Sequence, residues 1–303
     1  MSSKIKPFIL TVFLFLGAFT GVPSLAFSGY EFEPLITAQK LNSIPLKKVV
    51  ILDTRSSWKF LMGHIPGAIH LGDWRDFTLQ TGKVPGRLNR NKAFIAERLR
   101  ALGIRSRKTL VIYGDPLDKW RTDGRFFWMF KYFGFKRTAI LQGGLPQWEK
   151  AGFEIERGPG RKIYPSKLQP DKLKFREEYF ADQKWIAQRL GSPEIALIDN
   201  REKHEFEGAT PYGSPRGGHI PGAIHIDWRE FFRQDGTVKN RKQLKALLQT
   251  YSIREDQEIV VYCTGGVRSA MAFFVFHYLG YQVRNYDGSW WDWSHSPHLP
   301  IKS

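Results

Sequence analysis

Short apolar runs alternate along this chain with longer segments whose apolar residues recur at helical spacing. The short runs predict buried strands at 50–53, 109–113, 137–142, 196–199, 258–262 and 282–286. The longer segments predict helices at 92–102, 125–133, 241–248 and 270–279. Strands that alternate with helices are typical of an α/β fold, in which helices cover both faces of a mainly parallel sheet.

The pattern occurs twice because the chain contains an internal duplication. The peptide Gly-His-Ile-Pro-Gly-Ala-Ile-His stands at 63–70 and again, unchanged, at 218–225. An apolar run that ends in Asp-x-Arg precedes each copy, at 53–55 and at 199–201. The distance between the copies is far too long for a solenoid repeat, so the duplication predicts two similar domains in tandem.

The first residues read as a secretory signal peptide rather than as part of the fold. Lys4 and Lys6 form a charged start, residues 8–20 are apolar, and the small residues at 24–26 offer a cleavage site. The apolar run is shorter than the roughly 18 residues of a membrane-spanning helix, so no stable membrane anchor is expected. We expect an exported protein, periplasmic if its source is a Gram-negative bacterium.

These features divide the chain into four segments. We assign residues 1–26 to the signal peptide, 27–157 to the N-terminal domain, 158–176 to a basic linker with proline and glycine, and 177–303 to the C-terminal domain.

The formal net charge of +17 over 303 residues raises the question of an anionic partner. The lysines and arginines are scattered along the chain, so the charge predicts only weak steering of small anions. No nucleic-acid reader motif is recognised, and no nucleic-acid partner is expected.

The clearest candidate for chemistry is Cys263, the only cysteine of the chain, which directly follows the apolar run 258–262. The loop after it consists of Thr264, Gly265, Gly266, Val267 and Arg268, and a helical segment begins near Ser269. A loop between a strand and a helix points backbone N–H groups into a concavity, which lowers the pKa of a thiol placed there. We interpret Cys263 as a nucleophile. A buried structural cysteine would need neither the two glycines nor the arginine.

With these motifs in place, the chain resembles the tandem-domain rhodanese family of sulfurtransferases over essentially its whole mature length. The resemblance rests on the duplicated Asp-x-Arg and Gly-His-Ile-Pro-Gly-Ala motifs, on the Cys263 loop, and on the stretch 288–293, which looks like the closing Gly-Ser-Trp-x-x-Trp of the family. In that family only the C-terminal domain carries the nucleophile. This chain agrees, since Gly114 stands at the position that matches Cys263.

The resemblance implies two tandem rhodanese-like domains and the activity of a thiosulfate sulfurtransferase. Cys263 would take the outer sulfur of thiosulfate as a persulfide and pass it to cyanide or a thiol. The residues implied in donor binding are Arg268, Arg201, Thr264, Gly265, Gly266, Val267 and Ser269. The family implies no metal, no organic cofactor and a monomer.

Two departures from the family bear on the substrate. Thr264 and the two glycines stand where thiosulfate enzymes often carry basic residues, which leaves Arg268 to pair with the donor's sulfonate. Glu205 stands where 3-mercaptopyruvate enzymes carry a second arginine, and this disfavours that donor. Arg216 is the candidate to replace the missing arginine.

Several alternatives stay open at this point. Arg201 either contacts the donor or forms an ion pair with Asp199. The protein is either an enzyme or an exported sulfur carrier that holds a persulfide. A Cys-x5-Arg phosphatase is disfavoured, because only four residues separate Cys263 from Arg268. His64 and His219 are expected to make structural hydrogen bonds, His277 to lie in the core, and the tryptophans at 290–293 to form core or site wall.

Overall fold

The computed structural model describes residues 32–80, 82, 84–105 and 108–303. The predicted signal peptide lies outside these residues. Among the helices that are described, none combines the length and the apolar character needed to cross a membrane.

The N-terminal domain is built around a parallel sheet of five strands in the order β1-β5-β4-β2-β3. Its strands are β1 (Leu35–Ile36), β2 (Val49–Asp53), β3 (Ile69–His70), β4 (Thr109–Tyr113) and β5 (Thr138–Leu141). Its helices are α1 (Ala38–Asn42), α2 (Ser57–Met62), α3 (Lys92–Ala101), α4 (Thr122–Tyr132) and α5 (Gly144–Lys150). Short 3-10 turns lie at Leu46–Lys48 and Trp74–Phe77.

The C-terminal domain repeats this arrangement with the strand order β6-β10-β9-β7-β8, again all parallel. Its strands are β6 (Phe180–Ala181), β7 (Ile195–Asp199), β8 (Ile224–His225), β9 (Glu258–Tyr262) and β10 (Val283–Tyr286). Its helices are α6 (Gln183–Ala187), α7 (Lys203–Phe206), α8 (Arg241–Thr250), α9 (Arg268–Leu279) and α10 (Ser289–Ser294). Further 3-10 turns lie at Pro170–Lys172, Glu177–Tyr179 and Trp228–Phe231.

The predicted fold class is therefore confirmed, and the strands β4 and β9 begin and end where the apolar runs do. In the first domain α3 and α4 cover one face of the sheet, and α1, α2 and α5 cover the other. In the second domain α8 and α9 face α6 and α10 across the sheet. Continuous apolar strands such as β4 are what a sheet covered on both faces requires.

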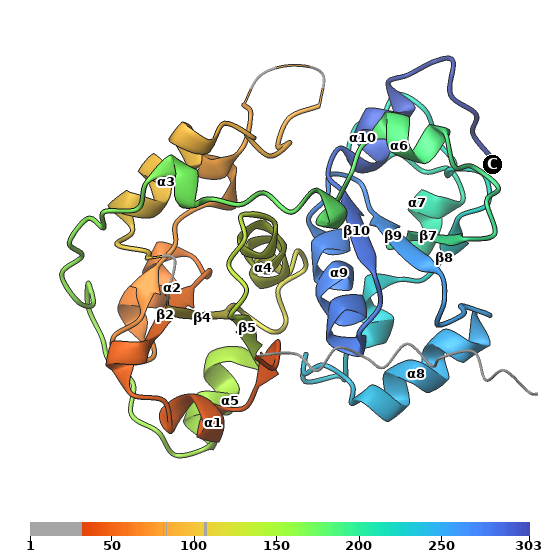
Figure 1. The fold of residues 1–303 in the computed structure, drawn as a ribbon. Helices are drawn as coiled ribbons and strands as arrows, with labels where there is room; N and C mark the ends of the chain where they lie inside the picture. The colour runs from red at the N-terminus through yellow and green to blue at the C-terminus, as the bar shows by residue number, and fades with distance from the viewer. Residues whose placement is uncertain (1–31, 81, 83, 106–107) are drawn as a thin grey trace, which may run out of the picture. The chain divides into compact units, whose positions relative to one another are not determined.

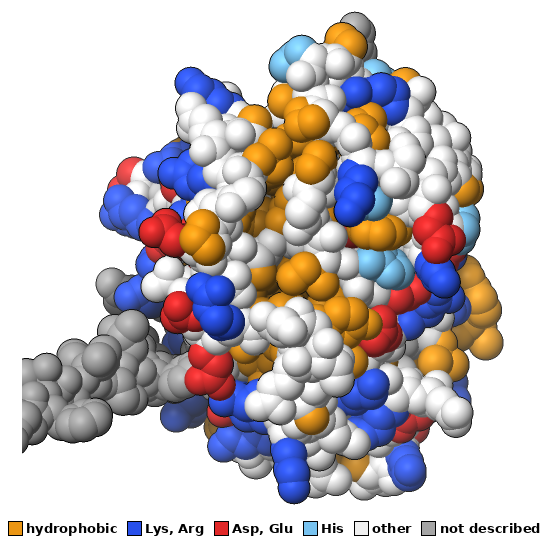
Figure 2. All heavy atoms as spheres, turned by 90° about the vertical axis from the view of Figure 1, so that its right-hand side faces the viewer, with side chains coloured by type: hydrophobic (Ala, Val, Ile, Leu, Met, Phe, Trp, Pro, Cys, Tyr) orange, Lys and Arg blue, Asp and Glu red, His pale blue; other side chains and the backbone are white. Residues whose placement is uncertain are grey.

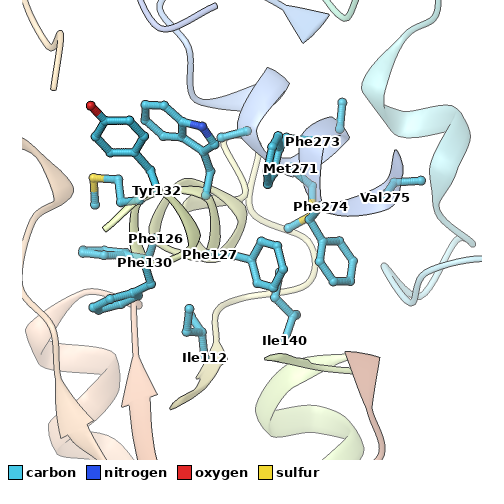
Figure 3. Packing of buried hydrophobic residues seen from close by; sticks show 14 of the residues in the cluster. Ile112, Phe126, Phe127, Phe130, Tyr132, Ile140, Met271, Phe273, Phe274 and Val275 are labelled. Atoms are coloured by element: carbon cyan, nitrogen blue, oxygen red, sulfur yellow. The ribbon is translucent and has the colours of Figure 1, made fainter. Parts of the chain in front are cut away.

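The two domains share one hydrophobic core, because α4 and α9 pack against each other between the sheets (Figure 1). Phe127 meets Phe274 edge to face, with ring centroids 5.0 Å apart (Figure 3). Gly124 allows the close approach of the helices, since a Cβ atom there would lie 2.5 Å from the Cα atom of Met271. The two sheets thus belong to a single compact unit.

The segment predicted as a linker is held against the N-terminal domain. Leu168 and Leu173 are buried in the shared core. The hydroxyl of Ser166 donates to the carbonyl of Ile104, and the amide of Lys174 donates to the carbonyl of Phe133. These contacts hold the connecting segment against the N-terminal domain.

Gly124→Ala should destabilise the protein, although alanine is the better helix former. The added methyl group has no room against α9, so we expect a loss of about 1–3 kcal/mol in the free energy of unfolding. Chemical denaturation measures this loss. Glu97→Ala, at an exposed position of α3, is the matched control and should change stability by less than about 0.5 kcal/mol. A neutral or stabilising Gly124→Ala would contradict the packing described here.

Candidate active site

Cys263 lies at the carboxyl end of β9, in a loop whose carbonyl groups are tied down from outside. The amide of Trp290 donates to the carbonyl of Cys263 at 2.9 Å, and the amide of Trp291 donates to the carbonyl of Thr264 at 2.9 Å. The amide of Cys263 itself donates to the hydroxyl of Ser289. With these carbonyls bonded to α10, the backbone amides of Gly265 and Ser269 bond the sulfur.

The pKa of the Cys263 thiol is lowered by this surrounding. Burial is the largest single influence and raises the pKa, since only 1% of the residue is exposed. The positive charge of Arg268, hydrogen bonds from the backbone and hydroxyl of Ser269, and one from the backbone of Gly265 together outweigh burial. The expected ionised thiol therefore has a physical basis in the described contacts.

Both glycines of the loop are required by close contacts. A Cβ atom at Gly265 would lie 2.6 Å from the indole of Trp291. Gly266 has a φ angle of +76°, and a Cβ atom there would lie 2.5 Å from the carbonyl oxygen of Asp287. The loop can therefore curl around the sulfur only with glycine at these two positions.

Arg268 is not free to hold a donor with its whole guanidinium group. Its Nη1 and Nη2 atoms form a bidentate pair with Glu205 at 2.7 and 3.0 Å, and Nη2 also donates to the hydroxyl of Thr264. The Thr264 hydroxyl in turn donates to Glu205. Burial raises the pKa of Glu205, but the bonds and charge of Arg268 lower it overall. Sequence reasoning recognised Glu205 only as a missing arginine and did not foresee this buried ion pair.

Cys263 opens into a cavity of about 670 Å³ between the two domains. The C-terminal domain contributes Tyr212, Cys263, Thr264, Gly265, Val267, Arg268 and Trp291. More of the described lining residues come from the N-terminal domain, among them Arg55, Trp74, Arg75 and Trp120. Of the predicted donor-binding residues, Thr264, Gly265, Val267 and Arg268 line this cavity, whereas Gly266 and Ser269 stand behind it.

Arg201 forms a buried ion pair with Asp199, which is the second of the two roles that the sequence left open. Its Nε and Nη2 atoms donate to Asp199 at 2.6–3.0 Å, and Nη2 also donates to the carbonyl of Gly218. Arg201 is not among the described residues that line the cavity. Its duplicate Arg55 makes the same bonds to Asp53 and does line the cavity. The duplicated motif alone does not say which copy faces the site.

The interpretation of Arg216 as a replacement for the missing arginine is wrong. Its guanidinium group donates to four backbone carbonyls at the end of α10 and beyond, those of Trp293, Ser294, Ser296 and Leu299. These bonds fix the loop before β8 against α10. An arginine that satisfies four carbonyls has little capacity left for a substrate.

The expectations for the three histidines and for the tryptophans at 290–293 are confirmed. His64 and His219 each bond a backbone carbonyl, those of Phe60 and Phe206, and stack on the same phenylalanine rings. His277 is buried, and burial lowers its pKa to about 3. Trp290 and Trp293 lie in the core, while Trp291 forms a wall of the cavity.

Sequence reasoning missed Arg125, a fully buried residue of α4 that reaches the cysteine loop from the other domain. Its Nη1 atom donates to the carbonyl of Gly266 at 3.0 Å and pairs with Asp287 at 2.6 Å. Its Nη2 atom donates to the carbonyl of Gly86, and Asp287 accepts the amide of Leu88. A cation on the Gly266 carbonyl holds this peptide group in place. The sequence signal was only an arginine directly before the aromatic run 126–128 of this helix.

The N-terminal domain has no equivalent cradle. A Cβ atom at Gly114 would lie 2.8 Å from the hydroxyl oxygen of Thr54 and 3.1 Å from Asp123, which leaves no room for a cysteine. The helix that follows, α4, begins only at Thr122, whereas α9 begins at Arg268, close behind Cys263. The first domain therefore cannot place a thiol against the start of a helix.

The loop after β9 places a buried thiol of lowered pKa at a cavity, which is the setting that the sequence predicted for sulfur transfer. The rhodanese-like domain family matches the chain twice, at residues 37–151 and 182–296. This chain belongs to the rhodanese-like family, with two tandem domains, and is a sulfurtransferase by family.

Named relatives agree at this level. The chain is 35% identical to the sulfur carrier protein TtuD of Thermus thermophilus, over 79% of this chain and 85% of that protein. It is 33% identical to a thiosulfate sulfurtransferase of Corynebacterium glutamicum, over 93% of this chain and 94% of that protein. The crystal structure of YnjE matches with a TM-score of 0.76 and 25% identity, covering 89% of this chain and 68% of that chain.

Arg125→Met should raise the pKa of Cys263 by about one unit, which is roughly a tenfold loss of thiolate near neutral pH. The reason is that the Gly266 peptide loses its cation and the amide cradle loosens. The measurement is the rate of iodoacetamide alkylation as a function of pH. Arg121→Met is the matched control, because Arg121 is also buried and bonds the other domain through Gly236, away from the loop. Equal alkylation profiles for the two variants would refute this role of Arg125.

Proposed function

We propose that this protein is a thiosulfate sulfurtransferase that works by double displacement at Cys263. The Cys263 thiolate attacks the outer sulfur of thiosulfate, the sulfur–sulfur bond of the donor breaks, and sulfite leaves with the bonding electrons. The enzyme is left as a cysteine persulfide. A thiol or cyanide then attacks the outer sulfur and restores the thiolate. Each step forms one bond to the transferred sulfur and breaks another, so the two steps need no oxidant or reductant.

The observation that carries this proposal is the lowered pKa of a thiol that lies in a cradle of amides and opens into a cavity. The same amides suit the persulfide, which is also an anion and extends one atom further into the cavity. Hydrogen bonds from Ser269 and Gly265 supply this stabilisation without a metal ion or a general base. Export of the enzyme is part of the proposal and rests on the leader-like residues alone.

The donor is proposed to be thiosulfate rather than 3-mercaptopyruvate. Glu205 brings a negative charge to the position where a second arginine would grip the carboxylate of mercaptopyruvate. Thiosulfate needs fewer positive groups than mercaptopyruvate for its binding. The buried Nε–H of Arg268 has no acceptor among the described residues, so it can donate to a sulfonate oxygen of thiosulfate. The thiosulfate sulfurtransferase named among the relatives supports this choice.

Incubation with thiosulfate should add the mass of one sulfur atom to the peptide that contains Cys263. Mass spectrometry of the intact protein and of its peptides measures this addition, and cyanide should remove it. Cys263→Ser should abolish both loading and turnover, because the alcohol is not ionised at neutral pH. Its unfolding curve, matched to that of the unaltered protein, is the control. Turnover that survives this substitution would refute the assignment.

Glu205→Gln should lower the KM for thiosulfate and the pKa of Cys263. Removal of the carboxylate charge leaves Arg268 with an uncompensated positive charge at the cavity wall, and we expect a change of roughly three- to tenfold in KM. Initial rates at varied thiosulfate give the KM, and alkylation against pH gives the pKa. Glu207→Gln is the control, since Glu207 is an exposed carboxylate two residues further along the chain, and its described ion pair is with Lys203. A raised KM would show that the ion pair itself is needed for the donor.

The second candidate function is a sulfur carrier, which the name of the Thermus thermophilus relative favours. A carrier would load Cys263 in the same way and would wait for a particular partner. Steady-state turnover of thiosulfate with cyanide separates the two functions. A carrier should give one burst that equals the enzyme concentration and then stop.

A further inference from the structure

The cavity in front of Cys263 is much larger than the proposed sulfur donor. Its volume of about 670 Å³ lies within the range of pockets that enclose drug-sized organic ligands. Thiosulfate has only a few heavy atoms. Most of the described lining residues belong to the N-terminal domain, which has no nucleophile. The larger part of the cavity is therefore open to the molecule that takes the sulfur away.

Aromatic rings form the walls of this larger part. Trp74 and Trp120 come from the N-terminal domain, and Tyr212 and Trp291 come from the C-terminal domain. Trp120 and Tyr212 meet edge to face across the domain boundary, with centroids 5.4 Å apart. Faces of this kind bind flat, apolar bodies and contribute little to the binding of an inorganic anion.

The cations of the cavity differ in how firmly they are held. Arg268 is buried, the side chain of Arg55 is 9% exposed, and each is bonded to a buried carboxylate. Arg75 lies over the ring of Trp74 at 4.7 Å and pairs with Asp73 at 3.1 Å, but its side chain is 59% exposed and that of Asp73 is 51% exposed. An exposed pair of this kind contributes little stability and is readily exchanged for another anion.

We propose that the sulfur acceptor is an organic thiol with a flat apolar body and an anionic group, bound among the aromatic rings of the cavity with its charge on Arg75. This inference rests on the proposed function. The acceptor thiolate attacks the outer sulfur of the Cys263 persulfide and forms a new sulfur–sulfur bond. The bond to Cys263 breaks, its electron pair returns to the Cys263 sulfur, and the acceptor leaves as a persulfide. The part of the cavity that the N-terminal domain lines is thus the acceptor compartment, while the nucleophile Cys263 lies in the C-terminal domain.

The duplication provides a matched control residue. Arg229 is the counterpart of Arg75, it pairs with Asp227 as Arg75 pairs with Asp73, and its side chain is also 59% exposed. Arg229 is not among the described residues that line the cavity. Substitution of either arginine by glutamine removes the same charge from the same local motif, and of the two only Arg75 is among the described residues that line the cavity.

The test follows the discharge of persulfide-loaded enzyme by two aromatic thiols of similar shape, 4-mercaptobenzoate and the uncharged 4-methylbenzenethiol. The unaltered enzyme should prefer 4-mercaptobenzoate. Arg75→Gln should weaken the apparent affinity for this thiol roughly three- to tenfold and leave the uncharged thiol unaffected. Arg229→Gln should change neither. Absence of a preference in the unaltered enzyme, or an equal loss in Arg229→Gln, would overturn the inference.

A binding measurement separates this inference from the proposed function. Calorimetry of 4-mercaptobenzoate with Cys263→Ser protein requires no sulfur transfer. If Cys263→Ser protein binds 4-mercaptobenzoate and the added Arg75→Gln substitution weakens this binding, the acceptor compartment is supported, even if thiosulfate fails to load Cys263. Absence of binding overturns the compartment and leaves loading by thiosulfate as a separate result.

Discussion

The structure depends on one constraint, which is that the peptide groups after Cys263 must turn their N–H ends toward the sulfur. A loop of this size has no means of its own to hold that orientation, because each peptide can rotate. The carbonyl ends are therefore fastened by neighbours, two of them by the amides of Trp290 and Trp291 and one by Arg125. Once the carbonyls are fixed, the amides of Gly265 and Ser269 can bond the sulfur. Together with the positive charge of Arg268 they lower the pKa of the thiol despite complete burial.

The buried pair with Glu205 limits the net positive charge at the site, although the charge of Arg268 is the largest of the influences that lower the pKa of Cys263. A lone guanidinium group at the cavity wall would attract any anion and would leave sulfite or sulfate bound after each reaction. The carboxylate of Glu205 offsets that charge and also fixes the guanidinium plane through two parallel bonds. The site then combines this partly compensated charge with oriented dipoles at the sulfur, which act over a short range and favour an anion where the reacting atom lies.

Elements close together in the sequence could be predicted, and partners far apart could not. The strands β4 and β9, the cysteine loop and the fold class follow from local periodicity and from the duplicated motifs. The ion pair of Glu205 with Arg268 joins residues 63 positions apart, and Arg125 contacts Gly266 from 141 positions away. No local pattern encodes such contacts. The roles of Arg201 and Arg55 were not separable either, because identical motifs in a duplication carry identical local signals and differ only in which copy faces the cavity.

The N-terminal domain has no nucleophile, but its contacts give it a role at the active site of the C-terminal domain. Gly114 has no room for a thiol, so the first domain cannot carry sulfur. Its helix α4 instead packs on α9 at Gly124, and this close packing brings Arg125 within reach of the Gly266 carbonyl. On the face drawn in Figure 2, lysine and arginine side chains are scattered among acidic and apolar ones, so surface charge alone gives little specificity there. The contacts that are specific to this site lie instead along the boundary of the two domains. There the N-terminal domain supports the cysteine loop of the C-terminal domain and provides much of the wall of the cavity in front of it.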